Sequence, residues 1–232
     1  MDEEDVGAAA RPSAEESKPA DAVLDISDLS TSSPNHPLHT ALRLWALLGN
    51  QSPKEDWHGP QMLIGEFDTV EDFWRHFNNI KMASKLATSD LSMFKKAIAP
   101  ACGDEMCKHG CQWVATLDNK SSFGVVGHYL DEAWLAIVLN MVNENFVDVG
   151  GEIVCAAVVS AGEKGRCQVA VWLSEREEEK FKRIGCAFAG ILRDAAGFMG
   201  EIHFEDFGEG GNEMFLLEDE WARAWPGYHE HT

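Results

Sequence analysis

Apolar and polar residues alternate in short runs through most of residues 35–207, and this pattern predicts a sheet. Such runs are typical of strands, because side chains of a strand point to alternate faces. Three other segments carry apolar residues at the spacing of a helix. We therefore predict an α+β protein with a mainly antiparallel sheet backed by helices on one face. The strands are expected at 42–48, 61–67, 111–117, 152–160, 167–174 and 200–207, and the helices at 70–80, 130–145 and 175–196.

The start of the first helix carries a capping signal. Asp68 and Thr69 are each followed three residues later by an acid, Glu71 or Asp72, as in a capping box. The apolar side chains that follow form one stripe, and Trp74 lies at its edge. A Trp at that edge could be half exposed.

The second helix is more apolar than packing against a sheet requires. Its apolar side chains spread beyond the ~100° stripe that one core contact needs, so part of this surface could face a partner. The alternative is that the first two helices are simply buried by the sheet and by each other. The residues concerned are Trp134, Leu135, Ile137, Val138, Leu139, Met141 and Val142.

The two ends of the chain differ from its body. Residues 1–34 hold acidic runs, Ser and Pro but few large apolar groups, so we predict a disordered acidic tail. Residues 35–207 form one domain, since a chain of 232 residues with 45% apolar composition can bury one good core. A Gly-rich stretch then begins a C-terminal extension, 208–232, in which we predict a short helix ending at Pro226.

The formal charge of −20 excludes broad nonspecific binding to a polyanion, which needs a large basic surface. Any contact with nucleic acid must be small and local. The sequence has no membrane-length apolar run and no signal peptide at its start, and its six cysteines fit reduced thiols. We expect a monomeric, cytoplasmic protein without a membrane anchor.

Four soft ligands lie close together at Cys102, Cys107, His109 and Cys111, and a zinc site is one interpretation. Their spacing is not that of paired zinc knuckles, and a single residue between ligands hinders tetrahedral closure. A loop of reduced thiols is the simpler interpretation, so we expect no metal and no other cofactor.

Catalytic motifs are missing from the sequence. The His residues have no Ser or Cys partner in a recognisable motif, and residues 162–166 lack the pattern of a P-loop. We therefore expect a binding protein and not an enzyme.

Three segments resemble the translation initiation factor 4E family. They are HPLHTALRLWALL at 36–48, FDTVEDFWRHFNNI at 67–80 and KGRCQVAVW at 164–172, and their order and spacing also match. The likeness covers roughly residues 36–207. It implies a cupped-hand fold, in which three helices pack on the convex face of a curved antiparallel sheet, and binding of the 7-methylguanosine cap of messenger RNA.

The same resemblance assigns residues to the cap. It gives Trp57 a stacking role, Trp172 the pocket wall near the methyl group, and Lys164 and Arg166 the phosphates. The chemistry agrees, because the positively charged methylated guanine is attracted to aromatic faces and the phosphates to basic side chains. A carboxylate is also needed to accept hydrogen bonds from the guanine.

The chain departs from the family pattern within this site. Where the family has a second stacking Trp followed by a guanine-binding Glu, residues 101–105 read ACGDE. The candidates there are Cys102, Gly103, Asp104 and Glu105, and Asp104 or Glu105 could supply the carboxylate. Two family cations are also absent, at Gly162 and Gln168.

On the convex face the resemblance implies a groove for a helical peptide, supplied by a scaffold protein like initiation factor 4G or by a 4E-binding repressor. A family Glu that helps to hold the peptide is replaced by Ala136, so partner choice could differ. The matching residues are His36, Pro37, Leu38, Val70, Trp74, Leu135, Leu139 and Val142.

These features together predict a non-catalytic factor in translation initiation or its regulation. The alternative is a family member with weak or lost cap binding. Such a protein would act through its convex face alone, as an interaction competitor or translational repressor.

Overall fold

The structure, a computed structural model, describes residues 35–47, 61–86, 90–100, 107, 109–117, 126–161, 167–198, 200, 202–207 and 215–216. For residues 126–128, 147 and 215–216 it describes the backbone alone.

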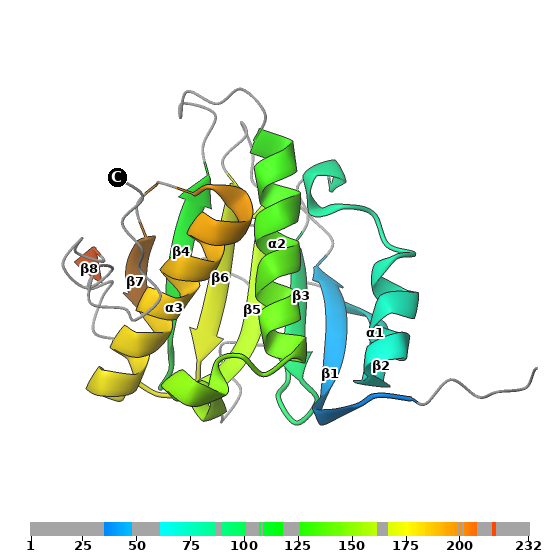
Figure 1. Ribbon diagram of the computed structural model, residues 1–232, viewed down its shortest axis with the longest axis horizontal. Helices are drawn as coiled ribbons and strands as arrows, with labels where there is room; N and C mark the ends of the chain where they lie inside the picture. The colour runs from blue at the N-terminus through cyan, green and yellow to red at the C-terminus, as the bar shows by residue number, and fades with distance from the viewer. Residues whose placement is uncertain are drawn as a thin grey trace, which may run out of the picture. The chain divides into compact units, whose positions relative to one another are not determined.

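Strands and helices alternate irregularly along the described part of the chain (Figure 1). The strands are β1 (Pro37–Leu47), β2 (Gln61–Thr69), β3 (Asp90–Lys95), β4 (Cys111–Leu117), β5 (Val154–Ala161), β6 (Cys167–Leu173), β7 (Ile202–Asp206) and β8 (Phe215–Leu216). The α-helices are α1 (Val70–Phe77), α2 (Val126–Val142) and α3 (Glu178–Ala196). Short 3₁₀ turns follow at η2 (Ala83–Lys85), η3 (Val147–Val149) and η4 (Gly151–Ile153).

All the strands belong to one sheet, in the order β2-β1-β3-β5-β6-β4-β7-β8. Every neighbouring pair is antiparallel. Figure 1 shows α2 and α3 lying across the central strands and α1 beside β2. The predicted class, an antiparallel sheet carrying three helices, is therefore confirmed.

The sheet separates two apolar clusters. The larger cluster joins all three helices to the sheet, whereas the smaller one contains no helical residue among those described. Consecutive residues of β3 belong to different clusters, because Met93 packs with the helices and Phe94 packs on the opposite face. The helices thus lie on one face of the sheet, and the smaller cluster marks the other.

The predicted capping signal of α1 is confirmed in part. Oγ1 of Thr69 accepts a hydrogen bond from the backbone N–H of Asp72 at 3.2 Å, so Thr69 is the N-cap. The other two helices also occur, with ends that differ from the predicted ones by a few residues.

The structure corrects the sequence-based element assignment at two places. Strand β3 was not predicted, because its polar Asp90 and Ser92 hide a segment that is in fact buried, at 7% and 3% exposure. A short helix was predicted in the C-terminal extension before Pro226, but Phe215 and Leu216 in this extension form β8 and pair with β7. The remainder of that predicted helix lies outside the described residues.

None of the helices in the described ranges combines the length and apolar character needed to cross a bilayer.

Two glycines of α3 allow a matched test of how closely this helix lies on the sheet. A Cβ added at Gly185 would lie 2.5 Å from the buried Trp113 indole, whereas one added at Gly190 would meet no atom within 4 Å. We predict that Gly185→Ala lowers the free energy of unfolding by about 1–3 kcal/mol through overpacking. Gly190→Ala should instead be neutral or raise it by up to about 1 kcal/mol through helix propensity. Urea denaturation of both variants measures this, and equal effects would contradict a close helix–sheet contact at Gly185.

Candidate binding surfaces on the two faces of the sheet

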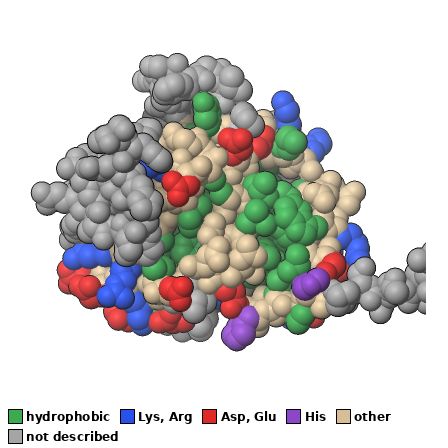
Figure 2. Space-filling model, viewed as in Figure 1, with side chains coloured by type: hydrophobic (Ala, Val, Ile, Leu, Met, Phe, Trp, Pro, Cys, Tyr) green, Lys and Arg blue, Asp and Glu red, His purple; other side chains and the backbone are tan. Residues whose placement is uncertain are grey.

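The helix-bearing face presents partly exposed apolar side chains from three separate segments. Leu38 comes from β1, Val70 and Trp74 come from α1, and Leu135 and Leu139 come from α2. All five are half-buried and pack against the large core cluster. Figure 2 shows hydrophobic side chains gathered in the region between α2 and α1 on this face. We call these five residues the apolar helix-face surface.

Hydrogen bonds fix the start of β1 against α1. The carbonyl of His36 accepts from the backbone N–H of Val70 at 2.9 Å. The backbone N–H of His36 donates to Glu71 at 3.0 Å, and Nδ1 of its ring lies 2.6 Å from Oε1 of the same carboxylate. These bonds lower the pKa of Glu71 to about 2. Residues far apart in sequence therefore form one edge of the apolar helix-face surface.

Trp74 is held in place by aromatic contacts. Its ring makes edge contacts with Phe73 and Phe77, at centroid distances of 5.0 and 6.0 Å. Phe73 is fully buried, while Trp74 remains partly exposed, as its position at the edge of the apolar stripe predicted. The indole is therefore a firmly held, partly exposed aromatic surface.

The remaining predicted partner residues are divided between surface and core. His36 and Pro37 are exposed at the start of the fold. Val142 is only 6% exposed and belongs to the core cluster, so it offers little surface of its own. Helix α2 was predicted either to face a partner or to be simply buried, and each interpretation agrees with part of it. Trp134 and Ile137 are buried, while Leu135 and Leu139 are half-buried.

On the opposite face, Trp172 of β6 forms the centre of an aromatic group. Its ring lies edge-on to Phe94 at 5.5 Å and tilted against Phe207 at 4.8 Å. Only 1% of Trp172 is exposed. The predicted wall residue thus lies on the helix-free face, packed firmly against its neighbours.

The described residues that border three segments predicted to bind the cap lie at one end of the sheet's strands. The end of β1, the start of β3 and the end of β5 are in register through Leu47, Asp90 and Ser160. The side-chain amide of Gln61, at the start of β2, donates to the carbonyl of Pro100. The described residues next to segments 48–60, 101–106 and 162–166 therefore lie near the same end of the strands.

Most of the predicted cap residues lie outside the described residues. Trp172 is the one cap candidate whose surroundings the described part of the chain includes. The others stay predictions: Trp57, Cys102, Gly103, Asp104, Glu105, Lys164 and Arg166.

Sequence reasoning missed a buried polar group near this edge. Asp90 is 7% exposed, shares the helix-free face with Phe94 and lies opposite Ser160. Burial raises the pKa of Asp90 to about 6, although a hydrogen bond with Ser160 acts in the opposite direction. Its signal in the sequence was an acid at the start of an apolar run.

The cysteines show no metal centre in the described part of the chain, where no three potential ligands come together. The thiol of Cys111 donates to the carbonyl of Glu175 at 3.7 Å, and burial raises its pKa to about 12. Cys107 is likewise fully buried, and Cys102 lies outside the described residues.

The fold and its two surfaces define an α+β protein whose single sheet carries helices on one face. The family model described as eukaryotic initiation factor 4E matches residues 37–207. The chain belongs to the initiation factor 4E family, a family of non-enzymatic cap-binding factors, in agreement with the expected absence of catalysis.

Curated relatives and solved structures support the same assignment. The bovine (Bos taurus) factor is 37% identical and the human (Homo sapiens) factor 36% identical, each over 146 residues that span 62% of this chain and 64% of the relative. Ascaris suum eIF4E-3 in complex with the m7G cap matches with a TM-score of 0.65 and 29% identity, covering 79% of this chain and 97% of that one. C. elegans eIF4E-3 in complex with the 4E-binding protein Mextli and a cap analogue matches with a TM-score of 0.62 and 28% identity, covering 74% of this chain and 92% of that one.

The buried Asp90 leads to a prediction about pH and stability. Its pKa is about 6 in the folded state against 3.8 ordinarily, so folding disfavours the ionised form. The penalty is absent below about pH 3.8, develops as the pH rises through 6, and is complete at neutral pH. Asp90→Asn should therefore raise the free energy of unfolding at pH 7 by about 2–3 kcal/mol, with a gain that shrinks toward pH 4.

Denaturant titrations of both proteins at several pH values test this. Asp194→Asn, which changes an exposed carboxylate on α3, serves as the control and should give no such trend. A pH-independent gain for Asp90→Asn would show that titration of Asp90 is not its cause.

Proposed function

We propose that this protein binds the 7-methylguanosine cap of messenger RNA beside the helix-free face, and docks a scaffold or repressor protein on its helix-bearing face. It would act in the cytoplasm in translation initiation or its regulation. The observation that carries the proposal is the division of the sheet into two differently built faces, one with the apolar helix-face surface and one with Trp172. Family relatives bound to an m7G cap and to Mextli support it.

The cap-binding half rests on chemistry that the chain retains. Methylation gives the guanine a positive charge, so stacking on Trp57 would gain cation–π attraction. Asp104 or Glu105 would accept hydrogen bonds from the guanine, and Lys164 and Arg166 would neutralise phosphate charge. Because segment 101–105 has no Trp, the base would be stacked on one aromatic platform, and selectivity for the methylated base should be smaller than with two.

The partner-binding half rests on the apolar helix-face surface. Leu135 and Leu139 lie one turn apart on α2, and Trp74 supplies an aromatic anchor from α1. An amphipathic helix places apolar residues at matching intervals, so its apolar stripe would bury these side chains. Ala136 carries no charge, and recognition here would depend on apolar contact more than on an ion pair.

A fluorescence titration tests cap binding. The Trp fluorescence of the full chain should be quenched by 7-methyl-GTP at lower concentration than by GTP, because only the methylated base carries the positive charge. We predict that Trp57→Ala weakens binding of 7-methyl-GTP about 5- to 100-fold, the range expected for loss of one stacking partner. Trp74→Ala is the control and should leave cap affinity unchanged. Equal quenching by the two nucleotides at millimolar concentration would contradict cap recognition.

A peptide titration tests partner binding. We predict that Trp74→Ala weakens binding of a peptide from the eIF4E-binding segment of Mextli about 30-fold or more, as expected for an aromatic anchor. Met62→Ala removes a half-exposed apolar side chain from β2 and should have little effect. Isothermal titration calorimetry measures both affinities. An equal loss of cap and peptide affinity in Trp74→Ala would show that this residue is needed for the fold and not specifically for the partner.

A second candidate function is an interaction protein that has lost useful cap affinity. The absence of a Trp in segment 101–105 favours this alternative, as does the formal charge of −20. Such a protein would compete for scaffold partners and repress translation. Peptide binding without preference for 7-methyl-GTP over GTP would support it over the first proposal.

A further inference from the structure

Four oxygen-bearing side chains form a row across the helix-free face of the sheet. The strands that carry them, β3, β5, β6 and β4, are neighbours in that order (Figure 1), and each residue lies opposite the next. The four residues are Asp90, Ser160, Gln168 and Thr116. Asp90 is four residues from Phe94 on the same strand, and Phe94 belongs to the helix-free cluster, so the row shares that face. We call these four residues the oxygen row.

The oxygen row lies beside a segment that we predict to meet the phosphates of the cap. Ser160 is the last residue but one of β5, and Gln168 is the second residue of β6. Both are therefore within two residues of segment 162–166. Asp90 is the first residue of β3 and lies at the same end of the strands.

Asp90 is the one acid of the row, and the described part of the chain gives it no cation. Its pKa is affected there by burial and by a hydrogen bond with Ser160, and by no Lys or Arg. The resemblance to the family places a Lys in this row, at the position of Gln168. The amide of Gln168 instead donates through Nε2 to Oγ1 of Thr116, at 3.3 Å. The chain thus has the carboxylate without the neighbouring positive charge.

The burial of Asp90 opposes folding at neutral pH. The side chain is 7% exposed, and its ionised form is disfavoured by loss of water. Ser160, opposite it, is also 7% exposed and donates a single hydrogen bond to it. A buried acid that lowers stability next to a proposed binding site is typical of a residue with a functional role. The carboxylate is therefore a candidate to bind a group of positive charge.

The chemistry of the oxygen row favours a hard divalent cation. It offers a carboxylate, two hydroxyls and an amide carbonyl, which are ligands of Mg²⁺ and Ca²⁺, and contains neither the Cys nor the His that Zn²⁺ favours. Ca²⁺ collects about six to eight oxygen ligands, whereas Mg²⁺ keeps several waters and is commonly held by one or two carboxylates together with phosphates. A single carboxylate beside a phosphate site therefore suits Mg²⁺.

We propose that Asp90 holds a Mg²⁺ ion that links the oxygen row to the phosphates of the cap. The carboxylate binds the ion, and the oxygens of Ser160 and Gln168 bind it directly or through its waters. The ion supplies positive charge that the family provides through the cations absent at Gly162 and Gln168. This inference rests on the proposed cap-binding function and adds a metal ion to it.

Cap and metal ion should bind cooperatively, because one carboxylate holds Mg²⁺ weakly without the phosphates. The test is a titration of the full chain with 7-methyl-GTP, followed by Trp fluorescence, in millimolar MgCl₂ or in EDTA at equal ionic strength. We predict that Mg²⁺ strengthens binding about fivefold or more, the range of coupling between two linked ligands. Binding of 7-methylguanosine, which has no phosphates, should not respond to Mg²⁺.

Three variants assign the effect to the oxygen row. Asp90→Asn should bind 7-methyl-GTP no more tightly with Mg²⁺ than without it, and unfolding cannot explain this loss because the substitution is expected to stabilise the fold. Gln168→Lys places a family-type cation in the row, so it should bind more tightly than the wild type in EDTA and lose the gain from Mg²⁺. Asp194→Asn removes an exposed carboxylate from α3 and is the matched control, in which the full gain should persist.

Failure of this inference can be told apart from failure of cap binding. If 7-methyl-GTP binds the wild type equally well with and without Mg²⁺, the metal site alone is overturned. A gain from Mg²⁺ that persists in Asp90→Asn has the same consequence, because complex formation between Mg²⁺ and the free nucleotide would then be its source. No binding of 7-methyl-GTP in either solution overturns cap binding and the metal site with it.

Discussion

The structure depends on one sheet whose central strands are buried on both faces. In β3 and β5 alternate side chains fill two different apolar clusters, so both faces need cover. Helices α1, α2 and α3 cover one face, and on the other the smaller cluster is closed by aromatic rings around Trp172. Because the cover differs, the two faces can carry different binding surfaces on one rigid framework.

This division separates the proposed partner site from the proposed cap site by the thickness of the sheet. The partner surface consists of half-buried apolar groups that belong to the same cluster as the core. Its geometry is therefore fixed by core packing, as the edge contacts of Trp74 with Phe73 and Phe77 illustrate. Substitution of a half-buried residue such as Leu139 would alter the surface of this cluster, whereas substitution of Val142 would alter its interior.

The net negative charge of the chain limits its contacts with anions to small local sites. A chain with a formal charge of −20 attracts few anions, so the proposed cap site would have to hold the phosphates through a small group of cations. Burial of an acid also lowers the free energy of unfolding, because Asp90 lies where its ionised form is disfavoured.

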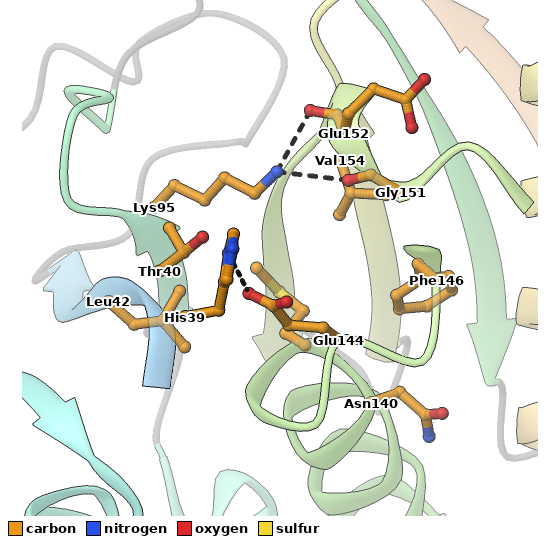
Figure 3. A pocket seen from close by; sticks show the side chains of 11 residues that line it. His39, Thr40, Leu42, Lys95, Asn140, Glu144, Phe146, Gly151, Glu152 and Val154 are labelled. Carbon is orange, nitrogen blue, oxygen red and sulfur yellow. Dashed lines mark hydrogen bonds and ion pairs between the residues drawn. The ribbon is translucent and has the colours of Figure 1, made fainter. Parts of the chain in front are cut away.

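Apolar periodicity along the chain was enough to predict the α+β class, the places of the three helices and most of the strands, because it reports which side chains must be buried. It also singled out Trp74 as a half-exposed residue. Asp90 and Ser92 could be assigned to a buried strand from the packed structure alone, since their polarity opposes the apolar pattern typical of such a strand. The packed structure was also needed to show that Val142 is in the core while Leu139 is half-buried, because neighbouring elements and not helix periodicity set that boundary. The pocket of about 410 Å³ between the end of α2 and strands β1 and β3 (Figure 3) was equally beyond the sequence, since its lining comes from four separate segments that approach one another only when the sheet and α2 pack together.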